Sequence, residues 1–316
     1  MWVMPEVGQS MINVGVVILN WRKSLHTIRC VESLLLARSE AGSAAKVRIV
    51  LVDNDSQGYD VEALTSWLQE SGAADCHLIC SNENLGFAGG MNLGIRFLES
   101  SKPDHYWLLN NDLVVEPGSV DSLVFSAKAF PDIAIWGPTV VDATTNLVQC
   151  AGGCRYYPCI GMDKSAYSGL PLNEVLNKPE GKFDYIYGAA MLVKGDFLRK
   201  SGGLDERYFL YFEELELASK LDSKQRLSWC KNAVVRHVGS SSISNDKDYR
   251  ARTSYHAALS AYRFTWNHYP ICLPTVVVFR ILGLAFRALV ERNSRLALAP
   301  VRALLHFSGV SARIDL

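Results

Sequence analysis

A chain of 316 residues is long enough for one large domain or two modest ones, and it can bury a substantial core. With 49% hydrophobic and 20% charged residues it has the composition of a globular protein, which excludes a disordered chain. Its 32 basic and 32 acidic side chains balance, so the overall field does not favour nucleic acid as a partner.

The balanced total conceals a basic C-terminal segment. From Ile271 onward six arginines are accompanied by only two acids, a local charge of +4, so residues 1–270 carry −4. The first apolar run is too short for a signal peptide and no basic region precedes it, so we expect a cytoplasmic protein. Cys150, Cys154 and Cys159 lie close together but form no C-x-x-C pair, so free thiols are favoured over a zinc site.

Four apolar runs alternate with helical patterns in the first half of the chain. They cover residues 14–21, 48–56, 76–86 and 105–112, and the continuous apolar character of the first two is typical of strands buried on both faces. Strand and helix alternation implies right-handed crossovers. We therefore predict an α/β fold with a doubly wound, mostly parallel sheet.

The pattern changes after Pro131, where short strands and loops are expected. Residues 183–194 and 227–242 are predicted as further strands. Residues 208–221 turn from aromatic to acidic at helical spacing, which predicts a helix.

Each of the four predicted N-terminal strands ends in polar residues. In open α/β sheets the ligand crevice lies beyond the carboxyl ends of the strands, so four such ends indicate the edge of one polar site. The clusters are Asn20-Trp21, Asp53-Asn54-Asp55, Asn82-Glu83-Asn84 and Asn110-Asn111-Asp112.

The segment 82–94, "NENLGFAGGMNLG", places Gly86, Gly89 and Gly90 where a strand passes into a helix. Glycines at this position allow the backbone to approach a phosphate, and they equally allow close packing of helix on sheet. The segment is neither a kinase-type P-loop nor a G-x-G-x-x-G dinucleotide fingerprint. Both interpretations stay open.

Carboxylates and one histidine are candidates for chemistry. Asp112 has the ligand type that a hard divalent cation prefers, although a lone acid in a turn is more often a turn residue. His237, usually structural when alone, would complete a metal site if the fold brought it to Asp112. Glu213, Glu214 and Glu216 follow an aromatic cluster, which raises carboxyl pKa values and suits a general base. The alternative for these acids is a solvated first helical turn favoured by the helix dipole.

These motifs, taken together and in order, resemble glycosyltransferase family 2 enzymes of the GT-A fold, and most closely the bacterial rhamnosyltransferase branch. The resemblance extends over residues 14–242. It implies a Rossmann-like nucleotide-sugar half at about 12–130 and an acceptor half at about 131–250 within a domain of residues 1–250, followed by a helical extension at 251–316. The motifs are "VVILNW", "IVLVDNDS", "NENLGFAGGMNLGI", "YWLLNNDLVVEP", "YGAAMLVKGDFLRKSGGLDERYFLYFEELEL" and "AVVRHVGSSS".

The resemblance also implies roles for the donor-site residues. Asp112 occupies the last position of the family's D-x-D motif and would hold Mg²⁺ or Mn²⁺ on the donor diphosphate, with His237 completing the metal site. Asn110 stands where the motif has its first acid, and Asn111 lies between them. The remaining donor-site candidates implied in this way are Asp53, which would bind the base or ribose, and Asn20, Asn84, Gly86 and Gly90.

The catalytic base of the family corresponds to Glu214, where an aspartate is usual. The longer glutamate leaves Glu213 and Glu216 as alternatives. Residues 187–192 match the strand that shapes the acceptor pocket, and Leu259-Ser260 replaces an R-N pair often found in the family.

The implied activity is an inverting transfer of L-rhamnose from dTDP-rhamnose to a glycan or lipid-linked acceptor in cell-surface polysaccharide synthesis such as that of O-antigen. Three alternatives stay open. They are a UDP-hexose donor on the same fold, a nucleotidyltransferase, and a non-catalytic module that binds nucleotide sugar.

Residues 271–307 are apolar but interrupted by Pro274 and by arginines. A basic amphipathic helix suits an anionic membrane surface, which would place the protein on the inner face of the cytoplasmic membrane. The alternatives are packing on the domain and self-association into a homo-oligomer.

Overall fold

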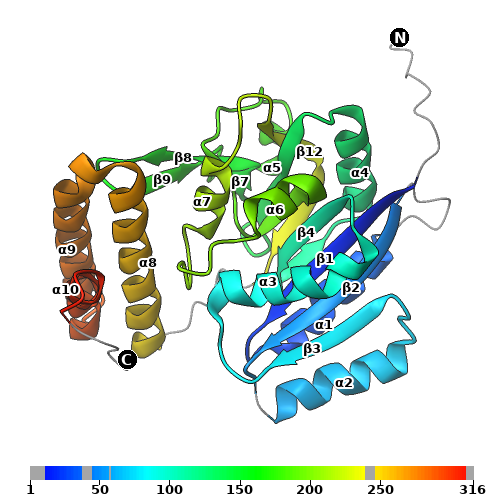
Figure 1. Cartoon of the computed structure of the whole chain (residues 1–316), viewed down its shortest axis with the longest axis horizontal. Coiled ribbons are helices and arrows are strands. Elements are labelled where there is room, and N and C mark those ends of the chain that lie inside the picture. Colours follow the sequence, from blue (N-terminus) through cyan, green and yellow to red (C-terminus); the bar gives the residue numbers. More distant parts are fainter. Residues whose placement is uncertain (1–10, 38–44, 57, 239–245, 311–316) are drawn as a thin grey trace.

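A nine-stranded sheet runs through the centre of the molecule in the computed structural model (Figure 1). The structure describes residues 11–37, 45–56, 58–238 and 246–310. Neighbouring strands follow the order β3 (Cys76–Ser81), β2 (Ala45–Asn54), β1 (Ile12–Asn20), β4 (His105–Asn110), β11 (Ala190–Lys194), β6 (Ile133–Asp142), β12 (Arg226–His237) and β5 (Leu113–Val115), and β7 (Val148–Ala151) pairs with β6.

Most of this sheet is parallel. The strands β3, β2, β1 and β4 pair in parallel, as do β6 and β12. Strand β11 is antiparallel to both of its neighbours, and β5 is antiparallel to β12. The prediction of a mostly parallel α/β sheet is therefore confirmed.

Helices cover both faces of the sheet, which explains the continuous apolar runs. One face packs under α1 (Ser24–Leu36), α2 (Tyr59–Ser71) and α4 (Ser119–Ala129), and the other under α3 (Gly86–Leu98), α6 (Gly195–Ser201) and α7 (Glu213–Ser219). In β1, Val16 and Ile18 join the first core and Val17 joins the second. Successive side chains of a strand point to opposite faces, so a strand covered twice must be apolar at every position.

Residues 183–194, expected as one strand, form two. Strand β10 (Tyr185–Ile186) joins β8 (Gly153–Tyr157) and β9 (Met162–Ser165) in a three-stranded sheet, whereas β11 belongs to the central sheet. The helix expected over residues 208–221 is shorter in the structure, where only α7 (Glu213–Ser219) is helical. Tyr211 and Phe212 adopt φ of 66° and 73°, a left-handed conformation that no α-helix tolerates.

Three helices at the C-terminal end pack beside the body, and the β8–β9 hairpin reaches toward them (Figure 1). They are α8 (Lys247–His268), α9 (Leu273–Val290), which follows the 3-10 helix η3 (Pro270–Cys272), and α10 (Ser294–Phe307). Their shared core includes Tyr262 and Val276. Hydrogen bonds tie them to the body: among others, Ser260 Oγ donates to the Leu210 carbonyl at 3.0 Å, and Thr275 Oγ1 donates to the Cys159 carbonyl at 2.7 Å.

All eight cysteines are free thiols, as expected from the sequence. Cys150 and Cys154 are buried with their sulfur atoms 3.9 Å apart, well beyond the length of a disulfide.

Substituting Gly86 tests how tightly α3 is packed. Gly86 has φ of 72°, and a Cβ there would lie 2.4 Å from the carbonyl oxygen of Phe209. Gly118 has a similar φ of 77° but no atom within 4 Å of the same position, so it is the matched control. We expect Gly118→Ala to lower the free energy of unfolding by about 1–2 kcal/mol through backbone strain alone. Gly86→Ala adds the collision and should lose at least about 2 kcal/mol more in urea unfolding. Equal losses would contradict the packing described.

Candidate functional site

A cavity of about 840 Å³ opens where β1, β4, β6 and β12 end. The strand ends contribute one wall, and the segment before α7 together with the start of α8 contributes another. Its lining residues include Trp21, Arg22, Lys23, Asn110, Asp112, Asp142, Gln149, Tyr187, Tyr211, His237 and Tyr249. The cavity lies at the carboxyl edge of the parallel sheet, where the strand-end polar clusters led us to expect a site.

Asp112 and His237 meet at this edge. Strand β12 pairs with β5 so that His237 lies opposite Leu113, and the Val238 amide donates to the Asp112 carbonyl at 2.8 Å. His237 Nε2 consequently lies 3.1 Å from Asp112 Oδ1, and both side chains are mostly buried. Residues separated by more than a hundred positions are thus neighbours because of one strand pairing.

The pair fits a divalent cation. Two ligands at right angles, each about 2.1 Å from Mg²⁺, lie about 3 Å apart. Asp112 Oδ1 is buried and receives no well-aligned hydrogen bond from the described part of the chain, with His237 Nε2 the group that approaches it. Burial alone would raise the pKa of Asp112, but His237 and Lys23 together lower it below its ordinary value, so the carboxylate is ionised.

The protein supplies few ligands for such a cation. Among the described residues no group of three or more His, Cys, Asp or Glu side chains is placed to hold a metal. Mg²⁺ commonly keeps several waters and takes one or two carboxylates plus substrate phosphates, so a two-residue site suits a metal that binds with its substrate.

Two cations follow the end of β1 and were not singled out from the sequence. Arg22 and Lys23 line the cavity, and the Arg22 amide donates to Ser56 Oγ at 2.6 Å. The Arg22 guanidinium lies 5.2 Å from the centre of the Trp21 ring. Guanidinium and ammonium groups at a strand end suit phosphate. The only sequence signal was their position directly after the first polar strand end.

Asn20 and Asp53 form a buried network. Asn20 Nδ2 donates to Asp53 Oδ1 at 2.7 Å, and the Ser56 amide donates to Asp53 Oδ2 at 2.9 Å. Asn111 also joins this network, because its Nδ2 donates to Thr27 Oγ1 at 2.9 Å. Of the triplet 110–112, therefore, only Asn110 and Asp112 line the cavity.

The glycine-rich turn packs against protein. The amide of Gly86 donates to Asn84 Oδ1 at 2.9 Å, and that of Phe87 donates to the Phe209 carbonyl at 2.7 Å. A Cβ on Gly90 would lie 2.4 Å from a methyl of Leu19. These contacts favour the packing interpretation of the turn over a phosphate-binding one.

Asn54 organises the same turn, a role the sequence did not reveal. Its Oδ1 accepts from the Leu85 amide at 2.9 Å, and its Nδ2 donates to Asn84 Oδ1 at 3.1 Å and to the Gly86 carbonyl at 3.0 Å. Its position beside Asp53 in a polar strand end was the only available signal.

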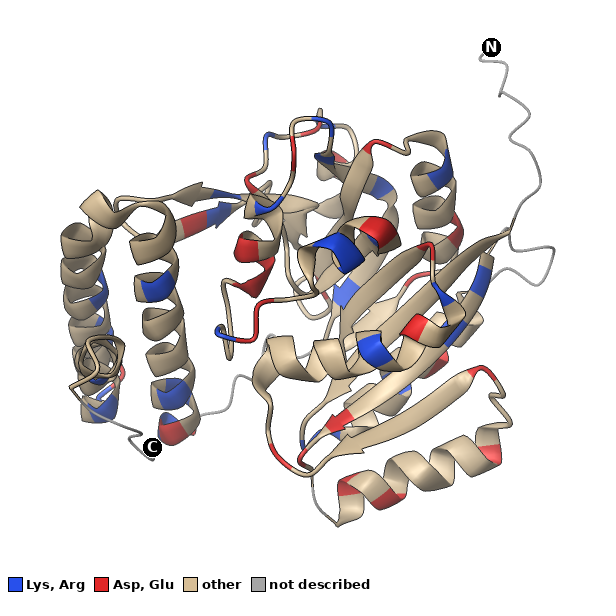
Figure 2. Ribbon diagram, in the orientation of Figure 1, with Lys and Arg blue, Asp and Glu red and all other residues tan. Residues whose placement is uncertain are grey.

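Helix α7 carries three acidic residues (red in Figure 2). Their side chains have different surroundings. Glu216 faces α8: Tyr208 Oη donates to its Oε2 at 3.0 Å, and His268 Nε2 lies 2.8 Å from the same oxygen. Glu216 therefore joins α7 to α8, and it does not line the cavity that contains Asp112.

Glu213 and Glu214 are adjacent acids whose charges influence one another, and Glu214 lies next to Gly188. Burial, and secondarily the negative charge of Glu214, raises the pKa of Glu213 well above its ordinary value. Burial raises the pKa of Glu214 to about 7, with a further contribution from Asp163. The two side chains therefore differ: the pKa of Glu213 is raised far from its ordinary value, whereas that of Glu214 lies near neutrality.

The same pair is connected to the turn at residues 110–112. Glu214 Oε1 lies 3.2 Å from where a Cβ on Gly188 would be, so the glycine leaves room for the carboxylate. The next residue, Ala189, accepts a hydrogen bond from the Asn110 amide at 2.9 Å. Glu214 and Asp112 are thus held to one another through the short segment between β10 and β11.

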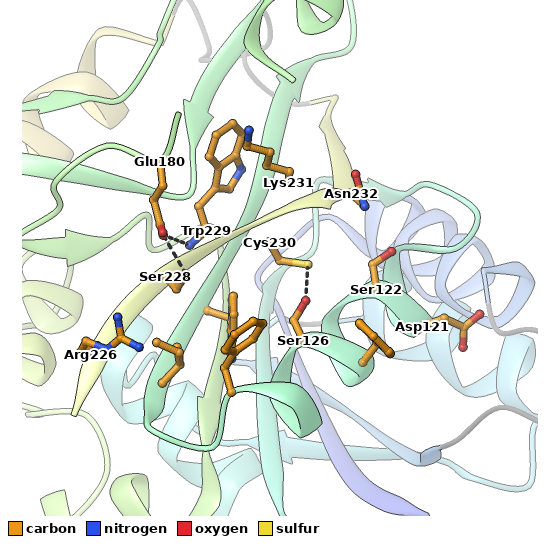
Figure 3. Close-up of a pocket in the computed structure, with 14 residues that line it drawn as sticks. Asp121, Ser122, Ser126, Glu180, Arg226, Ser228, Trp229, Cys230, Lys231 and Asn232 are labelled. Atoms are coloured by element: carbon orange, nitrogen blue, oxygen red, sulfur yellow. Dashed lines mark hydrogen bonds between the residues drawn. The ribbon is translucent and has the colours of Figure 1, made fainter. Parts of the chain in front are cut away.

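A second cavity of about 650 Å³ lies between α4 and β12 (Figure 3). Ser126 Oγ and Cys230 Sγ approach to 3.4 Å across it, and Glu180 accepts from Ser228 Oγ at 2.8 Å on the opposite rim. It contains none of the site residues predicted from the sequence.

Residues 16–149 match the model of the family described as "Glycosyl transferase family 2". The chain is 26% identical over 251 residues to an N-acetylglucosaminyl-diphospho-decaprenol L-rhamnosyltransferase of Mycobacterium tuberculosis, which covers 73% of this chain and 78% of the relative. It is also 26% identical over 216 residues to the low-salt glycan biosynthesis hexosyltransferase Agl10 of Haloferax volcanii, covering 67% of this chain and 62% of that protein.

Two solved structures share the fold. The mannosyltransferase PcManGT from Pyrobaculum calidifontis, in complex with GDP-Man and Mn²⁺, matches with a TM-score of 0.56 at 14% identity and covers 96% of this chain and 77% of its own. GalNAc-T7 with UDP, GalNAc and Mn²⁺ matches with a TM-score of 0.56 at 15% identity, and the match covers 80% of this chain and 51% of GalNAc-T7. The predicted GT-A fold is confirmed.

Replacing Glu216 tests its assignment to the fold. Glu216→Gln removes the charge that Tyr208 and His268 share, so the free energy of unfolding should fall by about 1–3 kcal/mol. Glu174→Gln breaks an exposed ion pair with Lys178 and should change it by less than about 0.5 kcal/mol. Chemical denaturation measures both. A Glu216 variant as stable as the Glu174 variant would contradict the assignment.

Proposed function

Because the chain carries a glycosyltransferase family 2 domain at residues 16–149 on a GT-A fold, we propose that it catalyses an inverting, metal-dependent sugar transfer from a nucleotide-diphosphate sugar. The observation that carries this proposal is the connection between two half-sites. Asp112 and His237 form one, Glu214 forms the other, and the hydrogen bond between Asn110 and Ala189 fixes their spacing.

Glu214 is the proposed general base. The Glu214 residue is half-buried, and its carboxylate lies beside Gly188 at the segment leading into β11, which the family resemblance assigns to the acceptor pocket. Burial raises the pKa of Glu213, which donates a hydrogen bond to Glu214, while the pKa of Glu214 of about 7 suits proton abstraction at neutral pH. Glu214 takes the proton of the acceptor hydroxyl, whose oxygen then attacks the anomeric carbon opposite the departing diphosphate.

Asp112 and His237 are the proposed holders of Mg²⁺ or Mn²⁺. A bound divalent cation neutralises negative charge on the departing diphosphate. Arg22 and Lys23, which line the same cavity, are placed to bind phosphate oxygens. Both structural neighbours named above hold Mn²⁺, which supports divalent metal use.

The proposed donor is dTDP-rhamnose. The rhamnosyltransferase relative supports the sugar, whereas the GDP and UDP complexes of the structural neighbours keep a UDP-hexose as the second candidate. The base or ribose is proposed to bind beside Asp53 and Asn20, whose side chains are buried in their own hydrogen-bond network outside the cavity lining and hold the strand ends in place. Asn84, Gly86 and Gly90 are proposed to hold the adjoining turn. Thermal-shift screening of dTDP-, UDP- and GDP-sugars with Mn²⁺ distinguishes the donors by the base that stabilises the protein.

Other functions are less well supported. A nucleotidyltransferase needs a basic glycine-rich loop near the first strand, and the segment after β1 contains no glycine before residue 42. A module that only binds sugar nucleotide would have no use for two adjacent carboxyl groups with raised pKa values, one of them at about 7.

The proposed acceptor is a glycan on a lipid carrier. The Mycobacterium tuberculosis relative is named for a diphospho-decaprenol substrate, and α9 offers a surface for lipid. Residues 270–290 have a mean hydropathy of 1.9, and only 17% of the most apolar window is buried. Large apolar side chains on one face, which we name the α9 stripe, are 52% to 93% exposed: Ile271, Val278, Phe279, Leu282, Phe286, Leu289 and Val290.

We propose that the α9 stripe lies on the inner face of the cytoplasmic membrane. An exposed apolar patch of this extent normally marks an interaction site, and the arginines of the C-terminal segment suit anionic lipid. On this view residues 1–250 form the catalytic domain and 251–316 form the extension that carries it to its lipid-linked acceptor. Self-association through the same stripe is the competing proposal.

The pH dependence of transfer tests Glu214. Protonated Glu214 cannot accept the acceptor proton, so kcat/KM should rise with pH through a midpoint of about 7 and then level off. Glu214→Gln should lower kcat/KM by about 10²- to 10⁴-fold. Asp163→Asn should move the midpoint to lower pH, because it removes a negative charge that raises the pKa of Glu214. Glu174→Gln, which removes an acid from an exposed ion pair with Lys178, is the control. A midpoint unmoved in Asp163→Asn with full activity in Glu214→Gln would refute the assignment.

Vesicle binding tests the α9 stripe. Leu282→Glu/Phe286→Glu removes two exposed apolar side chains, each worth about 1.5–3 kcal/mol when fully buried, so partition onto phosphatidylglycerol vesicles should fall more than about 10-fold. Phe125→Glu on α4 changes a side chain that is 54% exposed outside the stripe and should leave partition unchanged. Unchanged sedimentation of the double variant, with a smaller oligomer in size-exclusion chromatography, would favour self-association.

A further inference from the structure

A chain of hydrogen bonds leads from His237 away from the metal-binding face. His237 Nδ1 lies 2.8 Å from Gln149 Oε1, and Gln149 Nε2 donates to Asp142 Oδ2 at 3.1 Å. These three residues come from β12, β7 and the end of β6, and all of them line the same cavity. None of the motifs found in the sequence includes Gln149 or Asp142.

Asp142 fixes which groups donate and which accept in this series of hydrogen bonds. An ionised carboxylate only accepts hydrogen bonds, and Asp142 Oδ1 already accepts from the amides of Thr144 at 2.9 Å and Thr145 at 2.8 Å. The Gln149 amide must therefore turn its NH₂ group to Asp142 Oδ2 and its oxygen to His237. A carbonyl oxygen facing Nδ1 requires a proton on Nδ1, so a neutral ring carries its free lone pair on Nε2.

That lone pair points to the metal-binding face, since Nε2 lies 3.1 Å from Asp112 Oδ1. Two atoms that both carry lone pairs repel one another at this distance unless a cation lies between them. The reversed Gln149 amide would place NH₂ against Nδ1 and a proton on Nε2. Nε2 would then donate to Asp112, and the neutral ring could not bind a metal.

We infer that Gln149 and Asp142 are positioning residues that hold His237 in the tautomer a divalent cation requires. This rests on the proposed function, because it assumes that Asp112 and His237 bind the metal. In this arrangement Asp142 acts on the cation only through Gln149 and His237. Its effect passes through the orientation of one amide to one ring proton, and partners of this kind typically change metal affinity 10- to 100-fold.

Asp142→Asn is the most informative variant. Asn Oδ1 still accepts from the Thr144 and Thr145 amides and so keeps the turn, while its NH₂ replaces Oδ2 and favours the reversed Gln149 amide. We expect Mn²⁺ affinity, measured by electron paramagnetic resonance, to fall by about 10- to 100-fold. In ¹⁵N NMR spectra of the metal-free protein at about pH 9, the His237 proton should move from Nδ1 to Nε2. Loss of packing would not relocate that proton.

A double variant provides the rescue. In Asp142→Asn/Gln149→Glu, the new NH₂ group donates to one oxygen of the new carboxylate, and the other oxygen accepts from His237 Nδ1. Mn²⁺ affinity should return to within a few-fold of wild type, and the proton to Nδ1. Gln149→Met keeps the side-chain length but accepts no strong hydrogen bond. Its Mn²⁺ affinity should be low with either Asp or Asn at position 142.

The outcomes separate the inference from the proposed function. Mn²⁺ binding that Asp112→Ala does not weaken would overturn the proposed metal site and the inference with it. Binding that depends on Asp112 but is unchanged in Asp142→Asn, with the proton still on Nδ1, would overturn the inference alone. Weak binding in Asp142→Asn without rescue and without proton movement would assign Asp142 to the fold only.

Discussion

The pairing of β12 with β5 is the interaction on which the site depends. It sets Leu113 against His237 and thereby brings the only carboxylate of the 110–112 turn to within 3.1 Å of an imidazole. Both strands belong to the antiparallel end of an otherwise mostly parallel sheet. The parallel part collects polar strand ends at one edge, as this topology dictates, and the antiparallel pairing adds His237, the second proposed ligand.

A second constraint links catalysis to the C-terminal helices. Tyr211 and Phe212, held in the left-handed conformation, turn the chain directly into Glu213 and Glu214. Left-handed residues other than glycine cost of order 1–3 kcal/mol and persist only where surrounding contacts enforce them. Glu216 provides such a contact by joining α7 to His268 of α8. The helices that carry the α9 stripe are therefore connected to the proposed base through one short helix, α7. The proposed lipid contact and the proposed acceptor chemistry thus depend on the same packed helices.

Much of the sheet could be predicted from the sequence, because strands covered on both faces must be apolar throughout, as β1 is. The ordered motifs predicted the GT-A fold and the family resemblance, whereas the roles of Asp112 and Glu214 stay predictions. Contacts between distant segments could not be predicted in this way. The strand expected at 183–194 divides at Gly188 to make room for Glu214, and no periodicity signals that. Glu216 and Glu214 look alike in sequence, yet one faces α8 and the other faces Gly188. The roles of Gln149 and Asn54 follow only from the direction of their hydrogen bonds.

The central claim is that Asp112 and His237 join protein to donor through a shared cation, and calorimetry of nucleotide binding tests it most directly. Titration of the nucleoside diphosphate that stabilises the protein best should give at least about 10-fold tighter binding with Mn²⁺ than without it, and His237→Ala should abolish that difference. Nucleotide binding that is equally tight in wild type with and without Mn²⁺ would contradict the account.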